Sequence, residues 1–115
     1  MDVEEISDEW SKELKRGSIQ LGILALLSEG RKYGFQMIRE LRELTDGFLD
    51  LKEGTLYPAL HRLEKLRLLE SEWVIEGSNP PRKYYRLTKK GAAMLAGVTK
   101  ELWDFERLFD EAMAA

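Results

Sequence analysis

The stretch at residues 53–64 combines an anchoring face with side chains that suit nucleic acids. Leu56, Leu60 and Leu63 recur at helical spacing, so they share one face of a predicted helix. The rest of that helix carries a hydroxyl, a phenol, an imidazole and two cations, from Thr55, Tyr57, His61, Arg62 and Lys65. Such groups suit base edges and phosphate oxygens. They are also common on solvated helix surfaces, so the surrounding sequence must decide between the two interpretations.

The sequence offers little for catalysis or metal binding. It has no cysteine and one histidine, which excludes disulfides, thiol nucleophiles and thiolate metal sites and leaves no histidine cluster. A small enzyme remains an alternative, but no acid, base and nucleophile can be assigned to a common site. We therefore expect no enzymatic activity, no cofactor and no metal.

Length and composition indicate one small domain. The 115 residues are 34% charged and 43% hydrophobic, and no apolar run approaches the ~20 residues of a membrane span. The first ten residues are acidic, unlike a signal peptide. We expect a soluble, cytoplasmic protein with no membrane partner.

The distribution of charge favours a nucleic-acid partner more than the net charge of −3 does. Between Gly77 and Lys90 there is no carboxylate, whereas acids crowd the N-terminus. The cations of this basic strip are Arg82, Lys83, Arg86, Lys89 and Lys90. Binding to phosphates depends on local positive potential, which the strip supplies.

Helical patterns precede this strip. Ile6, Trp10 and Leu14 predict an amphipathic helix over residues 3–14. Gly17 and Ser18 are expected to end it, with Ser18 capping a second, largely buried helix over 19–27. A third helix is predicted at about 34–44, and a short linker then leads to the helix at 53, which gives a helix-turn-helix. Pro58 is tolerated there whether the helix starts near Thr55 or near Lys52.

The period of the sequence changes to that of β-structure after Leu69. Residues 70–76 and 83–87 are predicted to pair as a hairpin, because dense turn residues separate them at 77–81. Arg82 and Lys83 lie where such a wing would meet phosphates. The predicted fold class is therefore mainly α with a small β hairpin: a winged helix-turn-helix domain plus a long C-terminal dimerisation helix. A solvated hairpin that happens to be basic is the alternative.

Together these motifs resemble the PadR family of transcriptional regulators. The resemblance spans roughly residues 17–91, and the combination of motifs is more specific than any one of them. It is carried by Gly17-Ser18, Leu21 to Leu27, Tyr33-Gly34-Phe35, Glu53-Gly54-Thr55-Leu56-Tyr57-Pro58-Ala59-Leu60, Arg62-Leu63-Glu64-Lys65, Pro81-Arg82-Lys83-Tyr84-Tyr85-Arg86-Leu87-Thr88 and Gly91.

The resemblance implies a homodimeric repressor that binds double-stranded operator DNA and that, in some members, a small aromatic or phenolic effector releases. The helix at 53–66 would be the recognition helix, with His61 at a variable position suited to operator specificity. The implied DNA contacts are Thr55, Tyr57, His61, Arg62, Lys65, Arg82 and Lys83. The chain departs from the family pattern at Arg67, where glycine is common, at Lys52, where a capping serine is common, and at Phe35, where tyrosine is frequent.

The C-terminal segment is predicted to be a dimerisation helix that Thr88 caps. Its apolar stripe has the a and d spacing of a coiled coil and comprises Leu95, Val98, Leu102, Phe105 and Phe109. Ile6 and Trp10 are expected to pack on the same interface. The organisation is then residues 1–16 as an N-terminal amphipathic helix, 17–88 as the winged domain and 89–115 as the dimerisation helix. A dimer would read an inverted repeat with half-sites ~34 Å apart. The alternative to dimerisation is a C-terminal helix that folds back on its own domain.

Two further interpretations concern ligands and partners. Trp10, Met94, Trp103 and Phe105 could line a cavity between subunits for a planar apolar effector, or simply form the interface core. A winged-helix protein–protein adaptor without DNA binding is the alternative function. The cations at 62, 65, 82 and 83 favour DNA over the adaptor.

Overall fold

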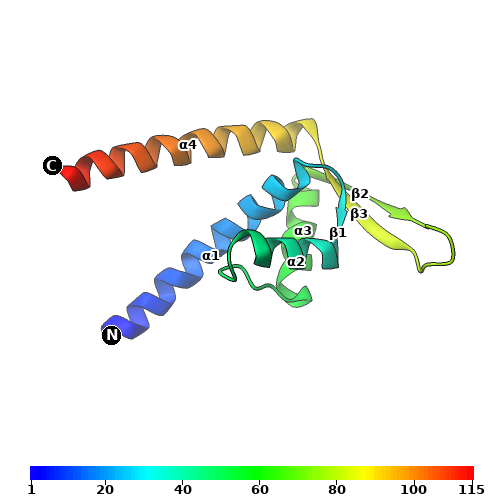
Figure 1. Cartoon of the computed structure of the whole chain (residues 1–115), viewed down its shortest axis with the longest axis horizontal. Coiled ribbons are helices and arrows are strands. Elements are labelled where there is room, and N and C mark those ends of the chain that lie inside the picture. Colours follow the sequence, from blue (N-terminus) through cyan, green and yellow to red (C-terminus); the bar gives the residue numbers. More distant parts are fainter.

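Four helices and three short strands make up the chain, and the computed structural model describes residues 1–115. The strands form one antiparallel sheet in the order β1-β3-β2 (Figure 1). In chain order the elements are α1 (Val3–Leu27), β1 (Lys32–Tyr33), α2 (Gly34–Leu44), α3 (Glu53–Lys65), β2 (Leu69–Val74), β3 (Arg82–Leu87) and α4 (Lys89–Ala114). The mainly helical fold with a β wing is confirmed, and β1 is a strand that the sequence did not reveal.

A core rich in leucine joins α1, α2 and α3 to the sheet. Each helix contributes one apolar face, so burying these faces together removes them from water at once. The side chains with almost no exposure are Ile23, Met37, Leu41, Leu56, Leu60, Leu63 and Leu69. This core fixes the orientation of α3 relative to α1 and α2.

The predicted break at Gly17 and Ser18 is wrong, because α1 is continuous from Val3 to Leu27. The Ser18 hydroxyl donates a hydrogen bond to the Leu14 carbonyl at 2.7 Å, so it serves inside the helix rather than as a cap. The helix starts instead at Asp2, whose carboxylate accepts from the Glu5 N–H at 2.9 Å. An N-terminal arm and the most buried helix of the core are therefore one element.

The start of α4 is fixed tightly to the domain. Thr88 caps the helix as predicted, because its hydroxyl accepts from the Gly91 N–H at 3.0 Å. A Cβ on Gly91 would overlap the Leu68 carbonyl oxygen and lie 2.8 Å from the Leu87 Cδ1 atom. Glycine is therefore required at this position, although a capping box would place glutamate there.

Beyond this anchor, α4 and the N-terminal half of α1 extend from the domain as two diverging arms (Figure 1). They lengthen the molecule to 59 Å along its longest axis, against 32 and 25 Å along the others. Gly91 is the only buried residue of α4. The helix therefore does not fold back over its own domain.

Candidate nucleic-acid interface

Helix α3 is anchored by its leucines and presents the opposite side outwards. It begins at Glu53, and the Lys52 carbonyl accepts from the N–H groups of Thr55 and Leu56 at 3.0 Å each. The start near Lys52 places Pro58 above the Gly54 carbonyl, where no Cβ adds to the crowding. A continuous helix therefore carries all five of its predicted contact residues.

These five residues lie on three sides of α3. The outward centre holds an exposed row at helical spacing, made of Gly54, Pro58, His61 and Lys65. Thr55 and Arg62 are exposed on the flank towards α1 and α4, where Arg62 lines a cavity of about 270 Å³ with Gln20 and Met94. His61 and Lys65 therefore project outwards, away from the leucine face of the helix.

Tyr57 lies on the third side, towards the wing, and is partly a packing residue. Its ring fills the space over Gly34 at the start of α2, because a Cβ there would lie 2.8 Å from the Tyr57 Cζ atom and closer still to its hydroxyl. Partial burial, aided by the nearby Glu53 carboxylate, raises the pKa of the Tyr57 phenol. The phenol therefore stays protonated at neutral pH and can donate a hydrogen bond.

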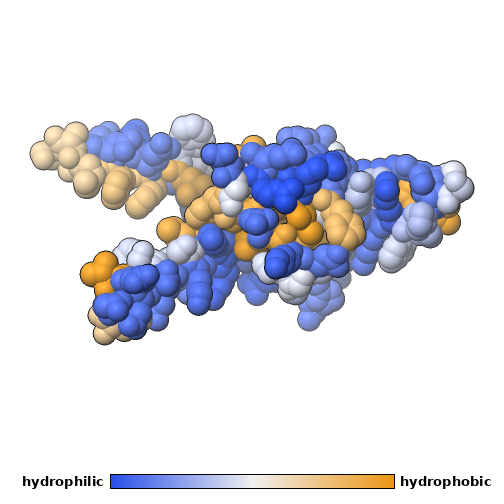
Figure 2. Space-filling view, turned by 60° about the horizontal axis from the view of Figure 1, so that its bottom comes forward, coloured by the Kyte–Doolittle hydropathy of each residue, from blue (hydrophilic) through white to orange (hydrophobic).

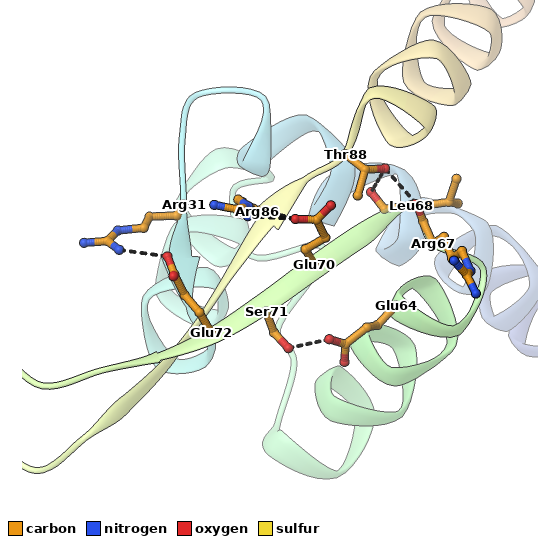
Figure 3. Close-up of polar contacts among 9 residues, drawn as sticks. All are labelled: Arg31, Glu64, Arg67, Leu68, Glu70, Ser71, Glu72, Arg86 and Thr88. Carbon is orange, nitrogen blue, oxygen red and sulfur yellow. Dashed lines mark hydrogen bonds and ion pairs between the residues drawn. The ribbon is translucent and has the colours of Figure 1, made fainter.

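Ion pairs divide the basic strip into paired and free cations. Arg86 pairs with Glu70 at 2.8 Å, and Arg31, which precedes β1, pairs with Glu72 at 3.1 Å (Figure 3). The Lys90 ammonium donates to the Leu66 carbonyl at 2.9 Å. Such partners reduce what these groups can offer to a phosphate.

Arg82 and Lys83 have no carboxylate partner. The Arg82 guanidinium lies 4.5 Å from the centre of the Tyr33 ring, and the Lys83 ammonium lies 5.6 Å from that of Tyr85. Aromatic faces hold a cation in place without neutralising its charge. The two wing residues predicted to meet phosphates therefore keep their full charge.

Polar contacts hold the sheet against the helices. The Ser71 hydroxyl on β2 donates to the Glu64 carboxylate on α3 (Figure 3). The Lys32 ammonium on β1 donates to Glu40 on α2 at 2.7 Å, and Glu29 lies 3.3 Å from it. The hydrogen bond with Glu40 raises the pKa of Lys32, and the same bond lowers the pKa of Glu40. The wing is thus fixed relative to α3.

An aromatic groove of about 690 Å³ separates the wing from the starts of α2 and α3. Its lining includes Tyr33, Phe35, Tyr57, Trp73, Arg82 and Lys83. The sequence marks Phe35 only as a departure from the tyrosine that is frequent in the family, and it does not connect Trp73 with a site. Pairing the two predicted strands in their observed register places Trp73 opposite Lys83, and this pairing was the signal that could have connected Trp73 with the wing cations.

A match to a known protein family identifies the class to which this chain belongs. Residues 23–97 match the model of the transcriptional regulator PadR-like family. The chain belongs to this family.

Relatives and solved structures agree with this assignment. A transcriptional regulator of Mycobacterium tuberculosis is 35% identical over 97 residues, which cover 84% of this chain and 86% of that protein. A PadR-like transcription factor from Bacteroides fragilis aligns with a TM-score of 0.76 and 33% identity over 90% of this chain and 97% of the other. Bacillus subtilis PadR in complex with operator DNA aligns with a TM-score of 0.63 and 26% identity, over 70% of this chain and 45% of that one.

PadR-like proteins are transcriptional regulators rather than enzymes, so the winged domain described above is that of a regulator. None of its helices is both long and apolar enough to cross a bilayer.

The arms of this PadR-like chain carry most of its exposed large apolar side chains. Figure 2 shows apolar atoms along the edge of one arm that faces the other. Among the predicted interface residues, Ile6, Trp10, Leu102, Phe105 and Phe109 are exposed, whereas Leu95 and Val98 are half-buried. The rings of Phe105 and Phe109 stack with their centres 5.8 Å apart.

The residues considered for an effector cavity are not gathered within one chain. Met94 lines the small cavity beside Arg62, whereas Trp103 lines a separate cavity of about 670 Å³ with Ser28 and Leu87. Trp10 lies on the other arm.

Proposed function

We propose that the chain is a homodimeric, sequence-specific DNA-binding regulator that represses transcription from an inverted-repeat operator. Two wing cations without carboxylate partners, Arg82 and Lys83, carry the proposal, because they lie across a groove from the exposed start of α3. A helix with an outward His61 and Lys65 can enter the major groove while the wing holds the adjacent backbone. The B. subtilis PadR structure with operator DNA supports this use of the fold.

The contact residues take different roles under this proposal. His61 and Lys65, at the outward centre of α3, would read base edges, and the phenol of Tyr57 would donate to the backbone. Thr55 and Arg62 would contact phosphates on the flank of α3. Arg82 and Lys83 would neutralise phosphates from the wing.

Dimerisation would cover the apolar faces of the arms. A soluble monomer seldom exposes a long apolar stripe, and the one on α4 has the spacing of a coiled-coil seam. A second copy whose α4 packs between the two arms would bury Phe105 and Phe109 together with Ile6 and Trp10. A planar aromatic or phenolic effector would then have its place between the subunits, beside Trp10 and Phe105.

Binding to DNA across a series of salt concentrations tests the proposal. The purified chain is titrated against its own upstream region and against a random duplex of equal length, with its molar mass measured by light scattering. We expect a dimer that prefers its own upstream region by a factor of about 10³ or more. Lys83→Ala should reduce the slope of log K against log salt by about one unit, because one phosphate contact is lost.

Two variants complete the design. Lys100→Ala is the matched control, since this lysine lies on α4 and pairs with Asp104 at 3.0 Å, and its slope should equal that of the wild type. His61→Ala should change the preference among sequences rather than the slope. An unchanged slope in Lys83→Ala would remove the wing from the mechanism. Absence of binding to either duplex at low salt would favour the protein–protein adaptor.

A further inference from the structure

The groove between the wing and α3 has walls of an unusual kind for an exposed surface. Trp73 on β2 is 68% exposed and Phe35 on α2 is 60% exposed, and both line the groove with Tyr57. None of the three belongs to the leucine core. Because the three rings line one groove, they form a shared apolar surface rather than a single exposed side chain, and such surfaces mark binding sites.

The charges at the groove indicate what the occupant is. Arg82 and Lys83 line the same space, and neither has a carboxylate partner. The register places Trp73 directly opposite Lys83, so an indole and an ammonium stand side by side along the wing. An occupant must therefore present negative charge and apolar surface within a few ångströms of each other.

A sugar–phosphate backbone has this alternation. Each phosphate carries a charge, and each deoxyribose between two phosphates presents C–H groups to an apolar wall. We propose that one DNA strand lies in the groove, with Trp73 and Phe35 packed against deoxyribose while Arg82 and Lys83 bind the flanking phosphates. This assignment rests on the proposed DNA-binding function and adds Trp73 and Phe35 to its contacts.

The two kinds of contact respond differently to salt. A cation that binds a phosphate releases counterions, so its loss changes the slope of log K against log salt. An aromatic ring on a sugar releases none. Its loss lowers the affinity by the same factor at every salt concentration. Since deoxyribose is the same in every duplex, that factor is also independent of sequence.

The test uses the full chain, the upstream-region duplex and the random duplex, each titrated at several salt concentrations. Trp73→Ala should weaken binding to both duplexes by about tenfold with an unchanged slope. Trp73→Phe keeps an aromatic wall and should recover most of the loss. Leu44→Ala is the control, because this leucine is similarly exposed, at 65%, but lies at the far end of α2. Circular dichroism and light scattering establish that each variant has the fold and mass of the wild type.

Each other outcome overturns the assignment. If the wild type binds DNA and Trp73→Ala binds with the same affinity, the aromatic contact is refuted and the DNA-binding function still stands. A loss confined to the upstream-region duplex would mean that Trp73 reads bases, and a changed slope would mean that it acts by placing Lys83. Failure of the wild type to bind either duplex overturns both the function and the groove contact.

Discussion

Replacing Gly91 with alanine should loosen the attachment of α4 to the winged domain. The added Cβ would overlap the Leu68 carbonyl oxygen and lie 2.8 Å from the Leu87 Cδ1 atom, so the first turn of α4 must move outwards. Backbone cannot give way as a flexible side chain can. The same carbonyl accepts from the Thr88 N–H at 3.1 Å, and the Thr88 hydroxyl donates to the adjacent Arg67 carbonyl at 2.7 Å, so both bonds would lengthen.

These terms give a magnitude. Two hydrogen bonds contribute about 1 kcal/mol each, and overpacking costs about 1–3 kcal/mol. The higher helix propensity of alanine returns up to about 1 kcal/mol. The free energy of unfolding should therefore fall by roughly 2–5 kcal/mol, a large share of the ~5–15 kcal/mol typical of a domain.

Urea denaturation followed by circular dichroism measures this change. Gly97→Ala is the matched control, because Gly97 lies in the same helix with open space around its Cβ position. That variant should gain up to about 1 kcal/mol from helix propensity alone. A Gly91→Ala chain as stable as the wild type, with the same m-value, would refute the argument from close approach.

Three further changes test other contacts. Glu40→Gln removes the partner that lies 2.7 Å from Lys32 and should lower the free energy of unfolding by about 1–2 kcal/mol at pH 7. The hydrogen bond from Lys32 lowers the pKa of Glu40 in the folded chain. The difference in unfolding free energy between wild type and variant should therefore be complete above the pKa of Glu40 in the unfolded chain, about 4.3, and vanish as the pH falls through the folded pKa. A difference that stays constant in denaturation from pH 7 to pH 2 would contradict this. Arg67→Gly should raise the free energy of unfolding by about 1 kcal/mol in thermal denaturation, because Arg67 has a φ of 62°, which glycine adopts without strain. A loss of stability in this variant would mean that the Arg67 side chain has another role. Gly34→Ala should displace the Tyr57 ring and lower the free energy of unfolding by about 1 kcal/mol. Gly54→Ala is the control and should cause no such loss, because Gly54 has open space around its Cβ position. Equal losses of stability in the two variants would count against the packing of Tyr57 on Gly34.

Local signals in the sequence were sufficient for several elements. The apolar spacing gave α2 its observed limits, and Thr88 caps α4 as its residue type suggests. The strain expected at Arg67 is present, since its φ of 62° is the conformation that glycine adopts most easily. Each of these features depends on neighbours within a turn or two, which a sequence pattern records.

Features that depend on distant partners were not visible. Strand β1 has two residues, too few for any periodicity, and exists because Lys32 and Tyr33 pair with Tyr85 and Tyr84 of β3. The basic strip appeared uniform until the register placed Arg86 opposite Glu70. The space over Gly34 likewise depends on Tyr57, which approaches from another helix.

The missing break in α1 bears on operator spacing as well as on the fold. A helix of 25 residues without a joint is a rod of about 37 Å, and it links the arm that would meet a second copy to the core that carries α3. Two such rods would hold a pair of α3 helices at one separation and one rotational phase. Each base pair inserted between half-sites shifts the second site by about 3.4 Å and turns it by about 35°. With no hinge at Gly17 to absorb the shift, the duplex itself would have to twist.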